Sequence, residues 1–117
     1  MHNFKELKVW NKALDLAINT YQLTKNFPSE EKFGLTSQIN RCAVSVPSNI
    51  AEGAGRNSGA DFGRFLDIAN GSCFELETLL IISEKIGILP KSDFEDNSQL
   101  IDEITKMIAG LKTSLKK

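Results

Sequence analysis

Histidine, cysteine and proline are scarce in this sequence, and their scarcity argues against several functions. Among 117 residues there are one histidine, two cysteines and three prolines. The histidine is His2, so a Ser–His or Cys–His nucleophile pair is not expected. Helical di-iron proteins carry Glu-x-x-His pairs, which are absent, and two isolated cysteines do not give the spacing of a zinc site. We therefore expect a protein that is not an enzyme and has no metal or cofactor.

Long apolar runs are also missing. No stretch of about 18 apolar residues occurs, and the first residues have no apolar segment of signal-peptide length. These features predict a cytoplasmic protein that does not enter a membrane and whose thiols stay reduced. We interpret Cys42 and Cys73 as small buried packing groups, with a regulatory disulfide as the alternative.

The chain also lacks an excess of basic charge. The formal net charge is −1, whereas dedicated nucleic-acid-binding proteins usually show a basic excess. Any contact with nucleic acid must therefore depend on a local patch.

The residues that are abundant favour helix. Apolar residues make up 41% of the chain and charged residues 25%, which is typical of a globular domain. Helix start and stop signals divide the chain into four stretches, which we expect at about 3–26, 29–52, 58–87 and 92–117. Short connections between long helices force antiparallel neighbours. The sequence thus predicts one all-α domain over residues 1–117, an antiparallel up-and-down four-helix bundle.

The start signals are local and specific. Asn3, Ser29, Ser58 and Ser92 are the expected N-caps, and Ser92 with Glu95 forms the clearest capping box. Gly87 is expected to end the third helix.

Folding the chain about residue 57 pairs the second helix with the third. Apolar residues then meet in five layers, which are Leu35 with Leu80, Ile39 with Leu76, Cys42 with Cys73, Val46 with Ala69, and Ile50 with Phe65. Pro47 lies within the second helix and predicts a bend there, which either wraps the helix around its neighbours or shapes a pocket.

Two helices carry more apolar residues than a bundle core requires. In the first helix we expect Leu7, Trp10, Leu14, Ala17 and Tyr21 to face the core, which leaves a second apolar seam. A similar second seam follows the third helix. These seams predict a homo-oligomer interface of Val9, Ala13, Leu16, Leu23, Ile68, Leu79, Ile82 and Ile86. A broad core face in a monomer is the alternative.

Polar residues in apolar surroundings give a second candidate site. Gln38 and Arg41 of the second helix are expected to lie near Glu77, with Glu75 as a further member, in a buried polar cluster that fixes helix register or a subunit contact. Glu52 beside Gly53 is expected to brace the turn between these helices. A carboxylate-based enzyme that uses Glu52, Glu75 or Glu77 is the less favoured reading.

A basic surface is the third candidate site. Lys5, Lys8 and Lys12 share one face of the first helix, and Arg56 and Arg64 flank the turn after the second. Repeated in an oligomer, these side chains could form a phosphate-binding surface. The alternative is that they are ordinary solubility residues.

Several strings of fixed spacing indicate a family. They are Leu7-x-Val9-Trp10, Phe27-Pro28-x-Glu30-Glu31-x-x-Gly34-Leu35-x-x-Gln38-Ile39-x-Arg41, Ser45-Val46-Pro47-x-Asn49-Ile50-Ala51-Glu52-Gly53, and Phe65-Leu66-x-Ile68-Ala69-x-Gly71-Ser72-x-x-Glu75-Leu76-Glu77-Thr78. On these residues the chain resembles the bacterial four-helix-bundle family named after reading frames in 23S ribosomal RNA intervening sequences. The last predicted helix has the general character of the family but contains none of these fixed-spacing strings.

The resemblance implies an up-and-down bundle and a homopentamer. It also implies a relation to the accessory proteins of diversity-generating retroelements, pentameric barrels that engage nucleic acid and a reverse transcriptase. Those proteins are markedly basic and this chain is not. The function expected first is therefore a non-enzymatic oligomeric scaffold that binds structured RNA or a protein–RNA complex. A protein-interaction module without a nucleic-acid role is the second hypothesis.

Overall fold

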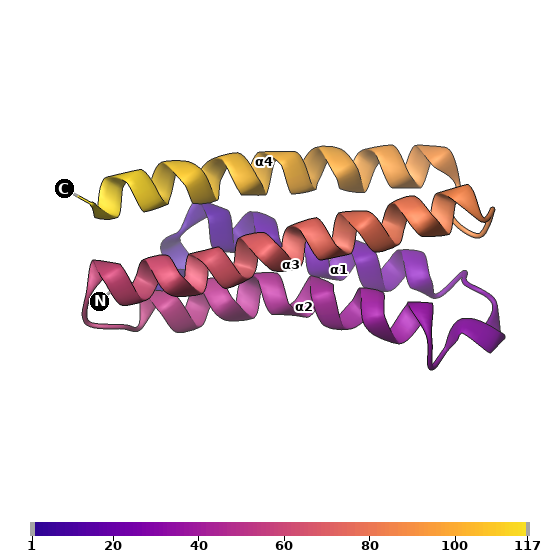
Figure 1. Cartoon of the computed structure of the whole chain (residues 1–117), viewed down its shortest axis with the longest axis horizontal. Coiled ribbons are helices and arrows are strands. Elements are labelled where there is room, and N and C mark those ends of the chain that lie inside the picture. Colours follow the sequence, from indigo (N-terminus) through magenta and orange to yellow (C-terminus); the bar gives the residue numbers. More distant parts are fainter. Residues whose placement is uncertain (1, 117) are drawn as a thin grey trace.

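The chain folds as an up-and-down bundle of four helices, as the sequence predicts (Figure 1). The computed structural model describes residues 2–116; Met1 and Lys117, which the predicted domain 1–117 includes, lie outside the described residues. The helices are α1 (Lys8–Thr24), α2 (Leu35–Ala54), α3 (Gly59–Lys85) and α4 (Lys91–Leu115), with 3-10 turns at Phe4–Glu6 and Ser29–Glu31. The body is 46 Å long and about half as wide, 23 × 20 Å.

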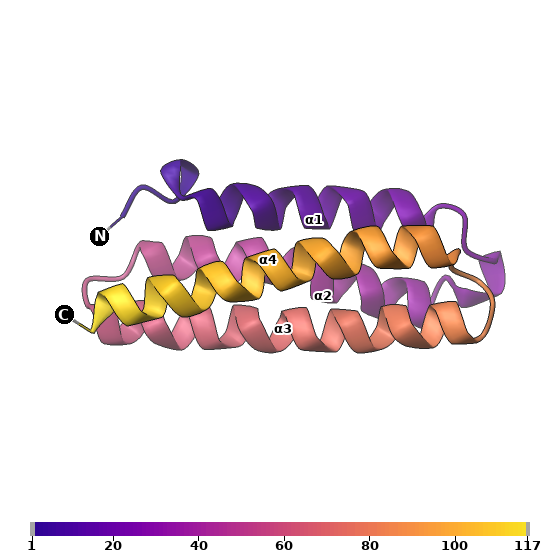
Figure 2. The ribbon, with the colours of Figure 1, turned by 90° about the horizontal axis from the view of Figure 1, so that it is seen from above.

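Each helix packs against the next, and α4 closes the bundle against α1. The α2–α3 pair makes the most extensive contact. Both chain ends and the α2–α3 turn lie at one end of the bundle, and the α1–α2 and α3–α4 connections lie at the other (Figures 1 and 2). Figure 2 shows α4 lying between α1 and α3 along one side of the molecule.

Two of the predicted helix signals are confirmed. The Ser58 side-chain oxygen accepts a hydrogen bond from the backbone N–H of Asp61 at 3.1 Å, so Ser58 caps α3. Gly87 follows the end of α3 with a φ of +86°, a conformation that glycine adopts without steric cost. The chain can therefore turn sharply towards α4.

The other three caps act differently. Asn3 accepts from the backbone N–H of Lys5, but it caps a three-residue 3-10 turn, because Leu7 is extended and α1 begins at Lys8. Ser29 likewise opens a 3-10 turn, and α2 begins only after Gly34. A cap signal shows where a turn can start, but the packing of the next residues decides whether the helix continues.

The Ser92–Glu95 capping box does not start α4. The helix begins at Lys91, directly after Pro90, whose φ of −59° and ψ of 144° already give the extended geometry of an N-cap residue. Ser92 is consequently inside the first turn, where its side chain cannot cap.

The α2–α3 pairing brings the predicted layers into the core. Ile39, Val46 and Ile50 of α2 are buried, as are Leu76 and Ala69 of α3. Cys42 and Cys73 are also buried, and both are free thiols. Leu35 and Phe65, at the two ends of the pairing, are half-buried. The hydroxyls of Ser45 and Ser72 lie 2.8 Å apart at the edge of the α2–α3 contact.

Pro47 is buried within α2 and does not end the helix. Because proline has no N–H, the carbonyl oxygen of Ala43, one turn earlier in the helix, lacks its usual hydrogen-bond donor. The bend expected at this point stays a prediction.

The second apolar seam of α1 is the more deeply buried one. Of the residues assigned to the core, Ala17 is buried as expected, and Leu7 and Trp10 are half-buried and pack against the core. Val9, Ala13 and Leu16, expected at an oligomer interface, are buried in the chain's own core, whereas Tyr21 is 47% exposed. Leu23, the fourth residue of that seam, is half-buried and packs against the core. As an oligomer interface, this part of the prediction is wrong.

Two buried threonines explain why the second seam faces the core. The Thr20 hydroxyl donates to the carbonyl oxygen of Leu16 at 2.7 Å, and the Thr24 hydroxyl donates to that of Tyr21 at 3.2 Å. A threonine whose hydroxyl bonds to its own helix can pack in a core like an apolar residue. The seam that contains them is therefore longer than its aliphatic residues alone suggest.

Gly53 permits the close approach of α2 and α3 beside their turn. A methyl group there would lie 2.7 Å from Cβ of Phe65 and 2.9 Å from Cδ1 of Phe62. Both distances are too short for unstrained carbon contacts, so a larger residue must push the helices apart.

We expect Gly53→Ala to destabilise the fold by about 1–3 kcal/mol, because the added methyl overpacks the contact. The matched control is Gly110→Ala in α4, where a methyl group meets no atom within 4 Å. That substitution should stabilise the protein by about 0.5–1 kcal/mol through helix propensity. Urea unfolding of both variants checks the prediction, and an unchanged midpoint for Gly53→Ala would contradict it.

Candidate functional site

Most of the predicted basic side chains are neutralised by nearby acids. Lys12 pairs with Glu103 of α4 at 3.1 Å, Arg56 with Glu52 at 3.3 Å, and Arg64 with Asp61 at 3.6 Å. These pairs are solvent-exposed, so each contributes little to stability and can exchange for another partner.

The remaining two lysines lie near the chain's amino end. Lys8 is exposed and has no ion pair within residues 2–116. The Lys5 ammonium lies 5.9 Å from the centre of the Phe4 ring. The backbone N–H of His2 donates to the carbonyl oxygen of Ala54, which holds this segment beside the α2–α3 turn. Lys5 and Lys8 therefore share one end of the bundle with Arg56 and Arg64.

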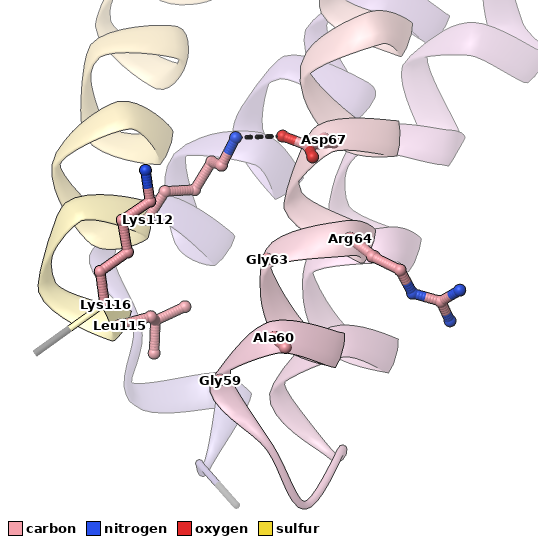
Figure 3. A pocket seen from close by; sticks show the side chains of 8 residues that line it. All are labelled: Gly59, Ala60, Gly63, Arg64, Asp67, Lys112, Leu115 and Lys116. Atoms are coloured by element: carbon pink, nitrogen blue, oxygen red, sulfur yellow. Dashed lines mark hydrogen bonds and ion pairs between the residues drawn. The ribbon is translucent and has the colours of Figure 1, made fainter.

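A cleft opens at this end between the start of α3 and the last turns of α4 (Figure 3). Three small residues of α3, Gly59, Ala60 and Gly63, form one wall. Lys112 and Leu115 of α4, with Lys116 directly after the helix, form the other. Lys112 reaches across the cleft to pair with Asp67, whereas the Arg64 side chain points away from it (Figure 3).

This cleft was not predicted from the sequence. The spacing of Gly59 and Gly63, four residues apart at the start of a helix, was the available signal, because such residues share one face. The cleft holds two lysines beside a helix N-terminus, where the backbone dipole also favours anions.

The predicted buried polar cluster does not form within one chain. Gln38, Arg41 and Glu75 are exposed, and Glu77 is half-buried and accepts a hydrogen bond from the Ser98 hydroxyl of α4 at 2.7 Å. Residues two positions apart in a helix are rotated by about 200° about its axis, so their side chains point to nearly opposite sides. Glu77 therefore faces α4 while Glu75 faces solvent, and the two carboxylates share no site.

Glu52 lies at the turn, as expected, but its partner is Arg56. The Arg56 guanidinium lies 4.7 Å from the centre of the Phe65 ring and bonds to the Glu52 carboxylate. The brace at the α2–α3 turn is thus an exposed ion pair above an aromatic ring.

The apolar seam of α3 is exposed, in contrast to that of α1. Ile68, Ile82 and Ile86 are 50%, 43% and 58% exposed, and Leu79 is half-buried. We call these four residues the α3 row. Trp10, Leu14 and Ala17, three of the α1 residues assigned to the core, line a shallow apolar groove against α2, together with Phe4, Val44 and Ala51.

Both cysteine thiols are buried and have raised pKa values. Burial raises the pKa of Cys42 to about 12, and the neighbouring Glu75 carboxylate adds to the effect. Burial also raises the pKa of Cys73 to about 12, with a contribution from the charge of Glu77. Thiolates are the reactive form, so neither cysteine is a nucleophile under ordinary conditions.

The described part of the chain contains no group of three or more His, Cys, Asp or Glu residues placed to hold a metal ion. Nor does any helix of that part combine the length and apolar composition that crossing a membrane requires.

Comparison with known proteins gives a family and a solved relative. The family model described as "23S rRNA-intervening sequence protein" matches residues 5–110. A crystal structure from Bacteroides thetaiotaomicron VPI-5482, described as a protein of unknown function from the S23 ribosomal protein family, superimposes with a TM-score of 0.83. It is 28% identical in sequence, and the match covers 90% of this chain and 95% of that one. No curated protein matches.

The raised thiol pKa values predict a loss of stability in alkali. The unfolded thiols ionise near pH 9.0 and the folded ones near pH 12, so the unfolded state loses protons first as the pH rises. The free energy of unfolding should fall between these values by up to about 1.4 kcal/mol per pH unit for each thiol. Urea unfolding at several pH values checks this. The control variant Cys42→Ala/Cys73→Ala should show a flatter decline, and equal slopes would contradict the prediction.

Proposed function

This chain belongs to the 23S rRNA-intervening sequence protein family, and we propose that it is a non-enzymatic scaffold protein that acts as a homo-oligomer. The assembly forms through the α3 row. The exposure of three isoleucines along a single helix carries the proposal. Contiguous exposed apolar patches on soluble proteins commonly mark interaction surfaces.

The charged residues beside the α3 row support an interface. Glu75 falls in line with the row, one turn before Leu79, and Arg41 is exposed on the adjacent helix. Neither takes part in an ion pair within the described residues. A second copy could provide a partner of opposite charge for each, which would set the register of the contact. The predicted cluster of Gln38, Arg41 and Glu75 would then form between subunits. The family resemblance makes a pentamer the expected assembly.

A second candidate function is contact with structured RNA. It is supported by the cations at one end of the bundle: Lys5, Lys8, Arg56, Arg64, Lys112 and Lys116. Ring assembly would repeat this group around an axis, so that a chain of net charge −1 could still present a local basic surface. The scaffold role does not depend on RNA; a protein partner is the alternative. We assign either role to the cytoplasm, which suits a chain whose two cysteines are free.

If the α3 row is an interface, the protein should self-associate through it, and one charged substitution within the row should abolish this association. The wild-type protein should sediment as an oligomer, and Ile82→Lys should sediment as a monomer with unchanged helical circular dichroism. Ile18→Lys in α1 is the control, because Ile18 is similarly exposed, 49% against 43%, but lies outside the row. A wild-type protein that stays monomeric up to high concentration, or equal effects of the two variants, would contradict the proposal.

The RNA role predicts a salt-dependent affinity. Fluorescence anisotropy with a labelled structured ribosomal RNA fragment should give saturable binding, and each phosphate contact adds about 0.7–0.9 to the slope of log affinity against log salt. Lys5→Glu/Lys8→Glu/Lys12→Glu should reduce that slope by about 2–3. The control Lys85→Glu/Lys91→Glu/Lys106→Glu makes the same change of charge elsewhere and should bind more strongly than the first variant. No binding at low salt would eliminate the RNA role and leave the scaffold role intact.

A further inference from the structure

The α3 row follows the edge of α3 that lies beside α2. The Ser72 hydroxyl of α3 lies 2.8 Å from that of Ser45 in α2. Ile68 comes four residues before Ser72, and Glu75 comes three residues after it. Residues at these spacings share one face of a helix. The row and the Glu75 carboxylate therefore belong to the side of the bundle that α2 and α3 form.

The adjoining side, formed by α1 and α2, also carries exposed apolar groups. The shallow groove between these two helices has a volume of about 310 Å³, and Val44 in its lining is 41% exposed. Phe33 lies in the connection directly before α2 and is 90% exposed, more than any other large apolar side chain between residues 2 and 116. Two neighbouring sides of the bundle thus present apolar surface, and α2 forms their common edge.

The contacts between α2 and α3 show which of their residues lie at the same height along the bundle. Ser45 is level with Ser72, and Gly53 is level with Phe62. Both helices rise by about 1.5 Å per residue, and they run in opposite directions. Each step towards the start of α2 therefore corresponds to one step towards the end of α3.

Three features of the α3 side have a complementary group at the same height on the α1–α2 side. The level pairs are Glu75 with Arg41, Ile68 with the groove, whose α2 lining runs from Val44 to Ala51, and Ile82 with Phe33. The first pair has opposite charges, and neither member has an ion pair within the described residues. The other two pairs are apolar. Figure 1 agrees with the last pair, because the α1–α2 connection and the end of α3 lie at one end of the bundle.

We propose that the α3 row of one copy packs head to tail against the α1–α2 side of the next copy. Ile68 enters the groove, and Ile82 packs against Phe33. Glu75 pairs with Arg41, which fixes the register of the contact. The inference rests on the proposed assembly through the α3 row, and it names the surface that covers the row.

The symmetry of such a contact explains why equal heights matter. In a ring whose axis runs along the bundle, all copies stand at the same height, so each group meets the neighbour's groups of its own height. A contact between two different faces repeats from copy to copy, and it leaves no face uncovered only when the ring closes. A symmetric contact between two α3 rows is the alternative. It would give a dimer and would assign no role to the groove or to Phe33.

The test is a mixing experiment with two variants of the full chain, each blocked on one side. Val44→Glu places a charge in the groove, and Ile82→Lys places one in the α3 row. Each variant alone should sediment as a monomer of 13.0 kDa with the helical circular dichroism of the wild type. Their equimolar mixture at high concentration should form a species of twice that mass, because the intact row of the first variant can pack on the intact groove of the second.

The outcomes separate this inference from the assembly on which it rests. A mixture that stays monomeric would overturn the head-to-tail contact. So would a wild-type dimer, or a Val44→Glu variant that assembles as the wild type does while Ile82→Lys does not. Those last two results would leave the α3 row as an interface, whereas a monomeric wild type would overturn both proposals.

Phe33→Ala tests the same contact without adding a charge. Loss of an aromatic anchor should raise the protein concentration needed for assembly at least about tenfold. The matched control is Phe74→Ala, because Phe74 is 54% exposed on α3 but lies outside the row. The control should assemble as the wild type does, and equal effects of the two variants would count against Phe33 as a contact residue and overturn the proposal.

A charge exchange tests the register. Arg41→Glu should weaken assembly about tenfold, because it places two carboxylates at the same height on facing copies. Adding Glu75→Arg to the same chain should restore assembly, since every contact then contains the exchanged pair. A double variant that assembles no better than Arg41→Glu would overturn the proposed register.

Discussion

Helices α2 and α3 approach each other closely beside their turn. At Gly53 of α2 there is no room for a methyl group, because Phe62 and Phe65 of α3 lie against it. This contact fixes how α3 is rotated about its own axis. With Leu76 and Leu80 directed into the core, Glu77 must face α4 and the α3 row must face outward. The exposed isoleucines thus follow from the packing of the α2–α3 pair. In our account they are covered by another copy of the chain.

The sequence predicts the α2–α3 half of the bundle well, because folding the chain about the turn between them places the apolar residues of the two helices opposite one another. Ile39, Val46 and Leu76 lie in the core as expected, and Ser58 caps α3. The orientation of α1 could not be derived in the same way, because two apolar seams compete there. Thr20 and Thr24 lie on the buried seam, and their burial becomes favourable only through hydroxyl bonds within the helix. Local cap signals fail similarly where Pro90 supplies the N-cap geometry before Ser92 can act.

Candidate sites are harder to predict than the fold, because charge pairing depends on which helices become neighbours. Lys12 is a free cation in the sequence, but the α1–α4 contact places it 3.1 Å from Glu103. Glu75 and Glu77 look alike in sequence, yet they face different surroundings. The solved relative shares the fold over nearly its whole length and is itself of unknown function, so the surfaces of this chain carry the functional argument.

The central claim is that the α3 row is covered in solution. Solvent paramagnetic relaxation of the isoleucine methyl groups by a soluble gadolinium chelate tests it most directly. In the single chain Ile68, Ile82, Ile86 and Ile18 are all exposed to similar degrees. Our account predicts that the methyl groups of the α3 row are protected from the chelate while that of Ile18 relaxes rapidly. Equally rapid relaxation of all four at high protein concentration would contradict it.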